Sequence, residues 1–306
     1  LVDIIKNMNS EYYYPVYNKT TQPLAIIDTV NAFFTYYYSA LRIYNRSHHL
    51  ESNTSLCEKP AGKWWPFTKS EIKTFNDFIS IFEGLFNRAL QKIQNCTKCK
   101  KCNIVFAIDC PRSEIWRSDI LKDNITNKSL YKSTRGTRQD IGIPSTLKYL
   151  YDTYLPKYNY QRIGVPKAEA DDVIGIITHF VNHYSPDRQV YVISDDSDFV
   201  QLLMYKNNHL LTQRLLNVRN KIKHSPQKLL EMKIIQGDRI DNIDSAFPKT
   251  GPKRSLNLIE NPKLLLKKIK IFGDMKLKRN RLLIDLSYIP YNIKGQILEK
   301  LFILKI

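Results

Sequence analysis

The sequence lacks several features, and each absence excludes a class of protein. No run of about 18 apolar residues occurs in the 306-residue chain, so no membrane-spanning helix is expected. Neither a signal peptide nor an internal repeat is recognisable. Acidic residues are scarce, with 29 Asp and Glu against 47 Lys and Arg, and the formal net charge is +18. Such a surplus indicates a polyanionic partner, most often nucleic acid.

Cysteine is also sparse, and its number is odd. Three of the five cysteines, Cys96, Cys99 and Cys102, form the run C-T-K-C-K-K-C. Such a run can hold zinc if Cys110 or Cys57 supplies a fourth ligand. The alternative, which we favour, is a lysine-rich loop with reduced thiols. That interpretation fits a cytoplasmic, reducing location.

Against this basic background, carboxylates gather in residues 167–199. They fall into two groups: Glu169, Asp171 and Asp172, then Asp195, Asp196 and Asp198. The first group precedes apolar residues at helical spacing in 173–180, and the second follows the β-branched run 190–193, which predicts a buried parallel strand. A crossover helix and the next strand can meet at the carboxyl edge of an α/β sheet, where ligands bind. Each group alone also suits an ordinary helix cap or turn.

Two earlier segments repeat the pattern of an apolar strand that ends in an acid. Residues 23–28 end in Asp28, and residues 103–109 end in Asp109. With Asp196, three predicted strands therefore close on an aspartate, which indicates one acidic pocket at one sheet edge. Close carboxylates repel one another unless a cation neutralises them, and oxygen-only ligands select hard divalent ions such as Mg²⁺. The sequence therefore predicts a metal site.

Residues 114–143 have a different character, because they lack hydrophobic periodicity. Basic and aromatic side chains are interleaved there: Trp116, Arg117, Lys122, Lys128, Tyr131, Lys132, Arg135 and Arg138. We interpret this stretch as a mobile basic segment that suits phosphate contact and base stacking on single strands. A solvated charged loop is the alternative.

Two further motifs follow a helix predicted over residues 225–235. Gly237-Asp238-Arg-Ile-Asp241-Asn242 places two acids three residues apart, on one side of a turn or helix end. The turn Gly251–Arg254 opens a helix whose N-terminal amides can bind a phosphate. Elsewhere the pattern predicts helices over 31–44, 68–86 and 144–155, a strand over 161–165, and lysine-rich helices beyond 256. Residues 45–67 are expected to be a loop insertion.

Taken in order, these motifs resemble the 5′-nuclease superfamily, which includes flap endonucleases, the 5′ exonuclease domain of bacterial DNA polymerase I and phage 5′ exonucleases. The resemblance covers residues 22–303 and rests on the ordered set Asp28, Asp109, Tyr131-Lys132-x-x-Arg135, Glu169-Ala-Asp171-Asp172, Asp196-Ser-Asp198-Phe199 and Gly237-Asp238-x-x-Asp241-Asn242. Two stretches, 108–136 and 283–293, are most similar to the ribonuclease H of T-even bacteriophages. One departure is Lys249-Thr250-Gly251, where the superfamily usually has two glycines, so the resemblance implies no monovalent-ion site there.

The resemblance implies a PIN-like α/β fold, with a twisted, mainly parallel sheet flanked by helices. A basic arch over about residues 114–143 and a helical, helix–turn–helix-type DNA-binding region belong to the same expectation. We divide the chain into an N-terminal extension (1–22), a nuclease core with the arch (23–215) and a C-terminal DNA-binding domain (216–306).

Site residues are implied motif by motif. First-site metal ligands are Asp28, Asp109, Glu169, Asp171, Asp172 and Asp196, and second-site ligands are Asp198, Asp238 and Asp241. The predicted catalytic residues are Lys132, Arg135, Asp109 and Asp171, the two basic ones as contacts to the scissile phosphate. The predicted nucleic-acid contacts are Arg117, Tyr131, Lys132, Arg135, Gly251, Lys253 and Arg254.

The implied function is a 5′-3′ exonuclease or flap endonuclease that uses two Mg²⁺ ions, for which Mn²⁺ can substitute. Its expected substrate is duplex DNA with a 5′ flap or an RNA primer, as in RNA primer removal during lagging-strand replication. We expect a cytoplasmic monomer, with a single-stranded-DNA-binding protein and a sliding clamp as candidate partners. Two alternatives remain open, a PIN-type endoribonuclease and a non-catalytic DNA-binding protein.

Overall fold

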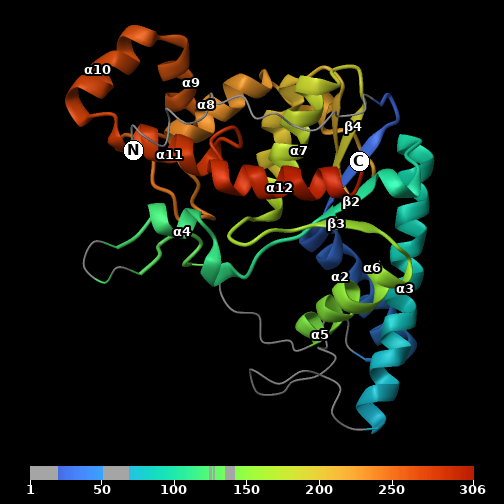
Figure 1. Ribbon diagram of the computed structural model, residues 1–306. Helices are drawn as coiled ribbons and strands as arrows, with labels where there is room; N and C mark the ends of the chain where they lie inside the picture. The colour runs from blue at the N-terminus through green and yellow to red at the C-terminus, as the bar shows by residue number, and fades with distance from the viewer. Residues whose placement is uncertain (1–19, 51–68, 124–125, 127, 135–141) are drawn as a thin grey trace.

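The computed structural model describes residues 20–50, 69–123, 126, 128–134 and 142–306 (Figure 1). Its centre is a five-stranded sheet in the order β3-β2-β1-β4-β5, in which every neighbouring pair is parallel. The strands are β1 (Leu24–Asp28), β2 (Ile104–Ala107), β3 (Gln161–Ile163), β4 (Val190–Ile193) and β5 (Asn208–Leu211). The prediction of a mainly parallel α/β sheet is confirmed.

Helices follow or connect these strands. They are α2 (Thr29–Ser47), α3 (Lys69–Thr97), α4 (Arg117–Ile120), α5 (Gly142–Tyr149), α6 (Leu155–Lys157), α7 (Ala170–Tyr184), α8 (Pro226–Gln236), α9 (Pro252–Glu260), α10 (Pro262–Phe272), α11 (Met275–Ile284) and α12 (Tyr291–Ile303). A π-helical turn, Leu150–Tyr154, joins α5 to α6, and the short 3₁₀ segments are η2 (Lys101–Asn103), η3 (Arg112–Glu114), η5 (Ser197–Met204) and η6 (Val218–Lys221). Among the described helices, none has the length and apolarity needed to cross a membrane.

The sheet lies between two helical layers (Figure 1). Side chains alternate between its faces, so Leu24 and Ile26 of β1 pack with α7 and α12, whereas Ala25 and Ile27 pack with α2 and α3. Both layers are needed because the strands are apolar on both faces. Helix α12, which belongs to the predicted C-terminal domain, thus contributes to the core around the sheet.

The strand order sets the position of the functional site. From β1 the chain proceeds to β2 and β3 on one side, and it returns to β4 and β5 on the other. Strands β1 and β4 are therefore neighbours, with Ile27 paired to Ile193. Their carboxyl ends flank the point where the direction of winding reverses, and open α/β sheets bind ligands at such a point.

Residues 114–123 and 128–134 contain more structure than the aperiodic segment that we predicted. They include α4 and an antiparallel bridge between Lys122 and Ser129. Ile115, Leu121 and Tyr131 are buried in a hydrophobic cluster with residues of α8 and α11. The described part of this stretch is therefore packed against α8 and α11, and its mobility stays a prediction. Residues 135–141, which contain Arg135 and Arg138, lie outside the described residues.

Candidate active site

A cavity of about 440 Å³ opens at the carboxyl edge of the sheet. Acidic side chains from distant parts of the chain line it: Asp28, Asp109, Glu169, Asp171, Asp196, Asp198, Asp238 and Asp241. This set contains every predicted metal ligand except Asp172. Lys132 and Lys233 lie in the same cavity, as do the aromatic ring of Phe34 and the aliphatic side chain of Ile240.

Asp28 and Asp109 lie at the carboxyl ends of the neighbouring strands β1 and β2. Asp28 ends β1 and caps α2, because its carboxylate accepts hydrogen bonds from the Asn31 amide (3.1 Å) and the Ser194 hydroxyl (2.8 Å). Asp109 lies two residues beyond β2 and accepts from the Ala170 amide (2.7 Å). Burial and the nearby Asp109 raise the pKa of Asp28 to about 7. Burial likewise raises the pKa of Asp109.

Glu169 is the residue that caps α7, in a capping box with Asp172. Its carboxylate pairs with the Lys132 ammonium and the Arg117 guanidinium, and it accepts a hydrogen bond from the Tyr131 hydroxyl (3.0 Å). Burial acts to raise the pKa of Glu169, but the two cations hold it below its usual value. Glu169 is therefore an ionised carboxylate in the wall of the cavity.

Asp171 and Asp196 line the same cavity, where the attraction of Lys132 for Asp171 is too weak to outweigh burial and repulsion. Burial, together with repulsion from Glu169 and Asp196, raises the pKa of Asp171 well above its usual value. Asp196 is exposed and caps η5 by accepting a hydrogen bond from the Asp198 amide (2.9 Å). A cation bound between these carboxylates would relieve the repulsion.

Asp172 and Arg117 have structural contacts that differ from the predicted ligand and nucleic-acid roles. The Asp172 carboxylate accepts hydrogen bonds from the Trp116 indole (3.0 Å) and the Glu169 amide (2.9 Å), and lies 2.7 Å from the Arg117 guanidinium. Arg117 also donates to the Leu283 carbonyl (3.0 Å) and is only 2% exposed. The structure thus argues against both roles, because Asp172 does not line the cavity and Arg117 does not reach the surface.

The Tyr131-Lys132 motif lies inside the molecule as well. The Tyr131 hydroxyl donates to Glu169 and to Asp241 (3.2 Å), and the ring is 6% exposed. Direct stacking of a base on Tyr131 is therefore not possible in this conformation. The Lys132 ammonium pairs with Glu169 and lies 3.8 Å from Asp241, so it reaches the cavity as a functional cation should. Arg135, its predicted partner, lies outside the described residues.

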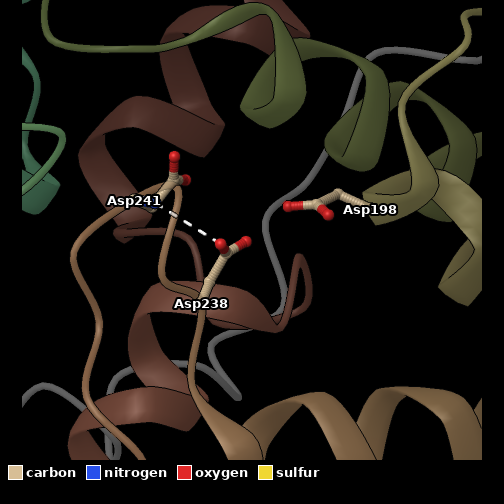
Figure 2. A group of neighbouring side chains, drawn as sticks. All are labelled: Asp198, Asp238 and Asp241. Atoms are coloured by element: carbon tan, nitrogen blue, oxygen red, sulfur yellow. Dashed lines mark hydrogen bonds between the residues drawn. The ribbon is translucent and has the colours of Figure 1, made fainter. Parts of the chain in front are cut away.

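A second group of carboxylates lies across the cavity. Asp198, Asp238 and Asp241 each offer an oxygen, and these atoms are all within 4.8 Å of one another. Figure 2 shows the carboxylates of Asp198 and Asp238 facing one another across a gap, with Asp241 on the same loop as Asp238. Gly237 starts this loop at φ +73°, where a Cβ would lie 2.2 Å from the Ile243 carbonyl oxygen, so the turn requires glycine.

Lys233 is a site residue that the sequence interpretation missed. Its ammonium group pairs with Asp198 and lies 2.8 Å from Asp238. Burial alone would lower the pKa of Lys233, but the two carboxylates hold it above its usual value. A signal was available, because Lys233 lies in the last turn of α8, directly before the Gly237–Asn242 loop. A basic residue there also suits the helix dipole, so the position alone did not indicate function.

The predicted duplex-binding turn lies outside the cavity. Gly251 caps α9, and Lys253 and Arg254 are exposed in its first turn. The Arg254 guanidinium donates to the Lys249 carbonyl (2.8 Å), which orders the turn before α9. The prediction that the Gly251–Arg254 turn opens a helix is confirmed, and contact with a phosphate there stays a prediction.

The cysteine run does not form a metal site in the described part of the chain. Cys96 and Cys102 are exposed, whereas Cys99 is buried. Across the described residues, Asp198, Asp238 and Asp241 are the one group of three or more His, Cys, Asp or Glu side chains close enough to share an ion. Cys57 lies outside the described residues. The interpretation of a loop with reduced thiols is the one that agrees with these positions.

The donor set fits hard divalent cations. All candidate ligands are carboxylates, which Mg²⁺ and Mn²⁺ prefer. Burial first, and repulsion between neighbouring carboxylates second, raise the pKa values of Asp28, Asp109 and Asp171. Eight acidic side chains and only two lysines line the cavity. Bound cations would supply the missing positive charge.

Comparison with known proteins agrees with this geometry. Residues 23–233 match the family model described as 5′-3′ exonuclease, N-terminal resolvase-like domain. A 5′-3′ exonuclease of Mycoplasmopsis pulmonis is 28% identical over 204 residues, which are 64% of this chain and 62% of the relative. The ribonuclease H of phage T4 is 27% identical over 225 residues, which are 64% of this chain and 68% of the relative. The chain thus spans less than two thirds of the Mycoplasmopsis protein.

Solved structures show the same fold. The D15 protein of phage T5, co-crystallised with metal ions, superposes with a TM-score of 0.62 at 18% identity, covering 93% of this chain and 100% of D15. The D15 flap endonuclease in a pseudo-enzyme-product complex with DNA and metal ions gives a TM-score of 0.60 at 17% identity, over 93% of this chain and 99% of D15. Since the family model covers more than half of the sequence, this chain belongs to the family of the 5′-3′ exonuclease N-terminal resolvase-like domain.

Proposed function

We propose that this protein is a divalent-metal-dependent 5′ nuclease that hydrolyses phosphodiester bonds at 5′ ends or 5′ flaps of DNA and in RNA primers paired with DNA. One observation carries the proposal: carboxylates from the ends of β1, β2 and β4, the start of α7 and the Gly237–Asn242 loop line a single cavity in a chain of net charge +18. Family membership and the D15 complex with DNA and metal ions support it.

Two groups of carboxylates would hold the ions. The second group is Asp198, Asp238 and Asp241, whose oxygens are already close enough to share an ion. The first group is Asp28, Asp109, Glu169, Asp171 and Asp196, which line the same cavity and would draw together around an ion. Mg²⁺ is the proposed metal at both, with Mn²⁺ as a substitute. When bound, such ions supply an activated water and stabilise the charge that develops on the phosphate. Asp172, in the role that we now propose, orients Glu169 through the capping box.

Lys132 is the proposed electrostatic catalyst. Its ammonium pairs with Glu169 in the structure, within the same cavity as the first group. Neutralisation of Glu169 by an ion would weaken that pair and free Lys132 to contact the scissile phosphate. Tyr131 then acts as a positioning residue, because its hydroxyl bridges Glu169 and Asp241, one from each group. Arg135 is proposed to contact the phosphate as well, on the basis of the Tyr131-Lys132-x-x-Arg135 motif.

Substrate binding is proposed to use the exposed turn at the start of α9. The amides after Gly251 and the side chains of Lys253 and Arg254 can contact the backbone of duplex DNA. Binding should weaken steeply with salt, and Lys253→Ala should reduce the slope of log affinity against log salt by about 1. The proposed role is removal of primers during replication, by a monomer in the cytoplasm. Its proposed protein partners are a single-stranded-DNA-binding protein and a sliding clamp.

A cleavage assay tests the assignment. The wild type, Asp109→Asn and Asp187→Asn are incubated with a 5′-labelled flap duplex, with and without Mg²⁺. Asp187 is a matched control, because it is an exposed aspartate in the loop before β4, at the opposite edge of the sheet. We expect Asp109→Asn to lose cleavage and keep DNA binding, and Asp187→Asn to match the wild type. Full cleavage by Asp109→Asn would refute the metal assignment.

Substrate choice separates the proposal from the two alternatives. Cleavage of flap duplex and RNA–DNA hybrid, with structured single-stranded RNA left intact, is the expected result. Preferential cleavage of the structured RNA would instead identify an endoribonuclease. Tight DNA binding with no cleavage of any substrate in Mg²⁺ or Mn²⁺ would identify a non-catalytic DNA-binding protein.

A further inference from the structure

Lys233 occupies a position that the proposed reaction does not explain. Its ammonium pairs with Asp198 and Asp238, two of the three carboxylates in the second group. These two carboxylates face one another across a gap in Figure 2. The Lys233 ammonium, which that figure does not draw, is within ion-pair distance of both. The side chain comes from the last turn of α8, which packs against η5, the segment that carries Asp198.

The surroundings show why a cation is held there. Burial and repulsion from Asp196 raise the pKa of Asp198 even with Lys233 beside it. Without the ammonium, Asp198 and Asp238 would repel each other in a partly buried site. Lysine suits the task because its charge is compact and its long stem lets the ammonium swing away. Lys228, on the same helix, differs in that it pairs with Glu260 in a largely exposed ion pair outside the cavity.

We propose that Lys233 is a tethered cation that occupies the second group in the ion-free protein and that a divalent ion has to displace. This inference rests on the proposed two-ion function. The ammonium and the ion compete for the same oxygens of Asp198 and Asp238, so Lys233 weakens ion binding at the second group. The first group contains different carboxylates and is not weakened by Lys233. Loading of both groups with ions therefore requires a higher ion concentration than loading of the first group alone.

The same contact has a second consequence, for stability. In the ion-free protein, the Lys233 pairs link the end of α8 to η5 and keep the Gly237–Asn242 loop next to Asp198. Removal of the ammonium should destabilise the ion-free protein while making ion binding more favourable. The stabilisation that a saturating divalent ion provides should therefore be larger in a variant without the charge.

Calorimetric titration with Mn²⁺ in the absence of DNA tests the proposal without using activity. The proteins are the wild type, Lys233→Met, Lys233→Gln as a second neutral variant, Lys233→Arg, which keeps the charge, and Lys228→Met as the matched control on α8. In the neutral variants, we expect the weaker of two sites to tighten by about tenfold or more, because a positive charge near a divalent ion is removed. In the same variants, the Mn²⁺ affinity of the tighter site should change by less than about twofold. Lys233→Arg and Lys228→Met should bind Mn²⁺ as the wild type does.

Thermal denaturation with chelator and with excess Mn²⁺ gives the second measurement. In chelator, we expect Lys233→Met and Lys233→Gln to have lower melting temperatures than the wild type. Excess Mn²⁺ should raise their melting temperatures by more than it raises that of the wild type. Unchanged or weaker binding at the second site in the neutral variants would overturn the proposal, as would an equal gain in Lys228→Met. Failure of the wild type to bind any Mn²⁺ would refute the proposed function itself. Two bound ions with no effect of Lys233 would refute only this inference.

Discussion

Removal of the Arg117 side chain is the perturbation that best separates the predicted role of this residue from its observed surroundings. We predicted a contact to nucleic acid, whereas the guanidinium lies between Glu169 and Asp172 and is 2% exposed. It also stacks on the Trp116 ring at 4.6 Å and donates to the Leu283 carbonyl. Arg117→Met keeps most of the apolar volume and removes only the charge and the donors.

The expected effect is large because two carboxylates lose a buried partner at once. Asp172 is fully buried and has no other cation within ion-pair distance in the described structure, and Glu169 keeps only Lys132. Breaking a buried ion pair by removing one partner typically costs about 3–5 kcal/mol. We therefore expect Arg117→Met to lower the free energy of unfolding by about that amount.

Urea denaturation monitored by circular dichroism, in chelator, measures the change. The double variant Arg117→Met/Asp172→Asn should recover about 1–3 kcal/mol, because it also removes the buried charge left without a partner. Lys122→Met is the control from the same segment. Its pair with Asp119 is exposed, so it should change stability by no more than about 1 kcal/mol.

The opposite pattern would support the original prediction. If Arg117 contacts phosphate, its substitution should change the free energy of unfolding by less than about 0.5 kcal/mol. It should reduce the slope of log DNA affinity against log salt by about 1. If Arg117→Met shows that result, with no recovery from Asp172→Asn, then the account of Arg117 as a buried structural cation is wrong.

Three further changes test other parts of the site. Asp28→Asn should raise the urea midpoint of the ion-free protein at pH 8, because burial raises the pKa of Asp28 to about 7 and the stabilising, protonated form is progressively lost as the pH rises from about 4 through 7. The gain in free energy of unfolding should be at most about 4 kcal/mol and should vanish near pH 4. A gain that does not depend on pH would contradict this cause. Tyr131→Phe should cost about 1.5–3 kcal/mol, because it removes the one hydroxyl proton that the Glu169 and Asp241 carboxylates share, with DNA affinity unchanged in a binding assay; a loss of affinity with normal stability would favour base contact. Gly237→Ala should destabilise the protein by more than about 1 kcal/mol, because the added Cβ would collide with the Ile243 carbonyl. In calorimetry it should weaken Mn²⁺ binding at the second of two sites. Unchanged Mn²⁺ affinity there would show that the loop tolerates a Cβ.

The cavity could be predicted from the sequence because strand direction and strand ends are local properties. Each short apolar run ending in Asp28, Asp109 or Asp196 predicts a buried parallel strand. Parallel strands present their carboxyl ends at one edge, so the three acids had to converge if the strands joined one sheet. No long-range contact needed to be known for this step.

The basic segment was misinterpreted for a physical reason. Arg117 and Tyr131 are buried by partners that lie far away in the sequence, such as Leu283 and Asp241, and these contacts leave no periodic pattern. A polar residue that is buried by pairing looks the same in a sequence as one exposed for binding. Lys233 escaped notice for the related reason that a lysine in the last turn of a helix is common.

The contrast between cavity and surface constrains the order of events at the site. Eight acidic side chains and two lysines line the cavity, although the chain as a whole has a net charge of +18. The basic surface attracts a polyanion, but the phosphate that must enter the cavity meets an excess of negative charge there. Bound divalent ions would reverse the sign of that local field, and in our proposal they compete with Lys132 and Lys233 for the carboxylates. We therefore expect productive entry of a phosphate to depend on ion binding, and initial attachment of DNA to the basic surface to be independent of it.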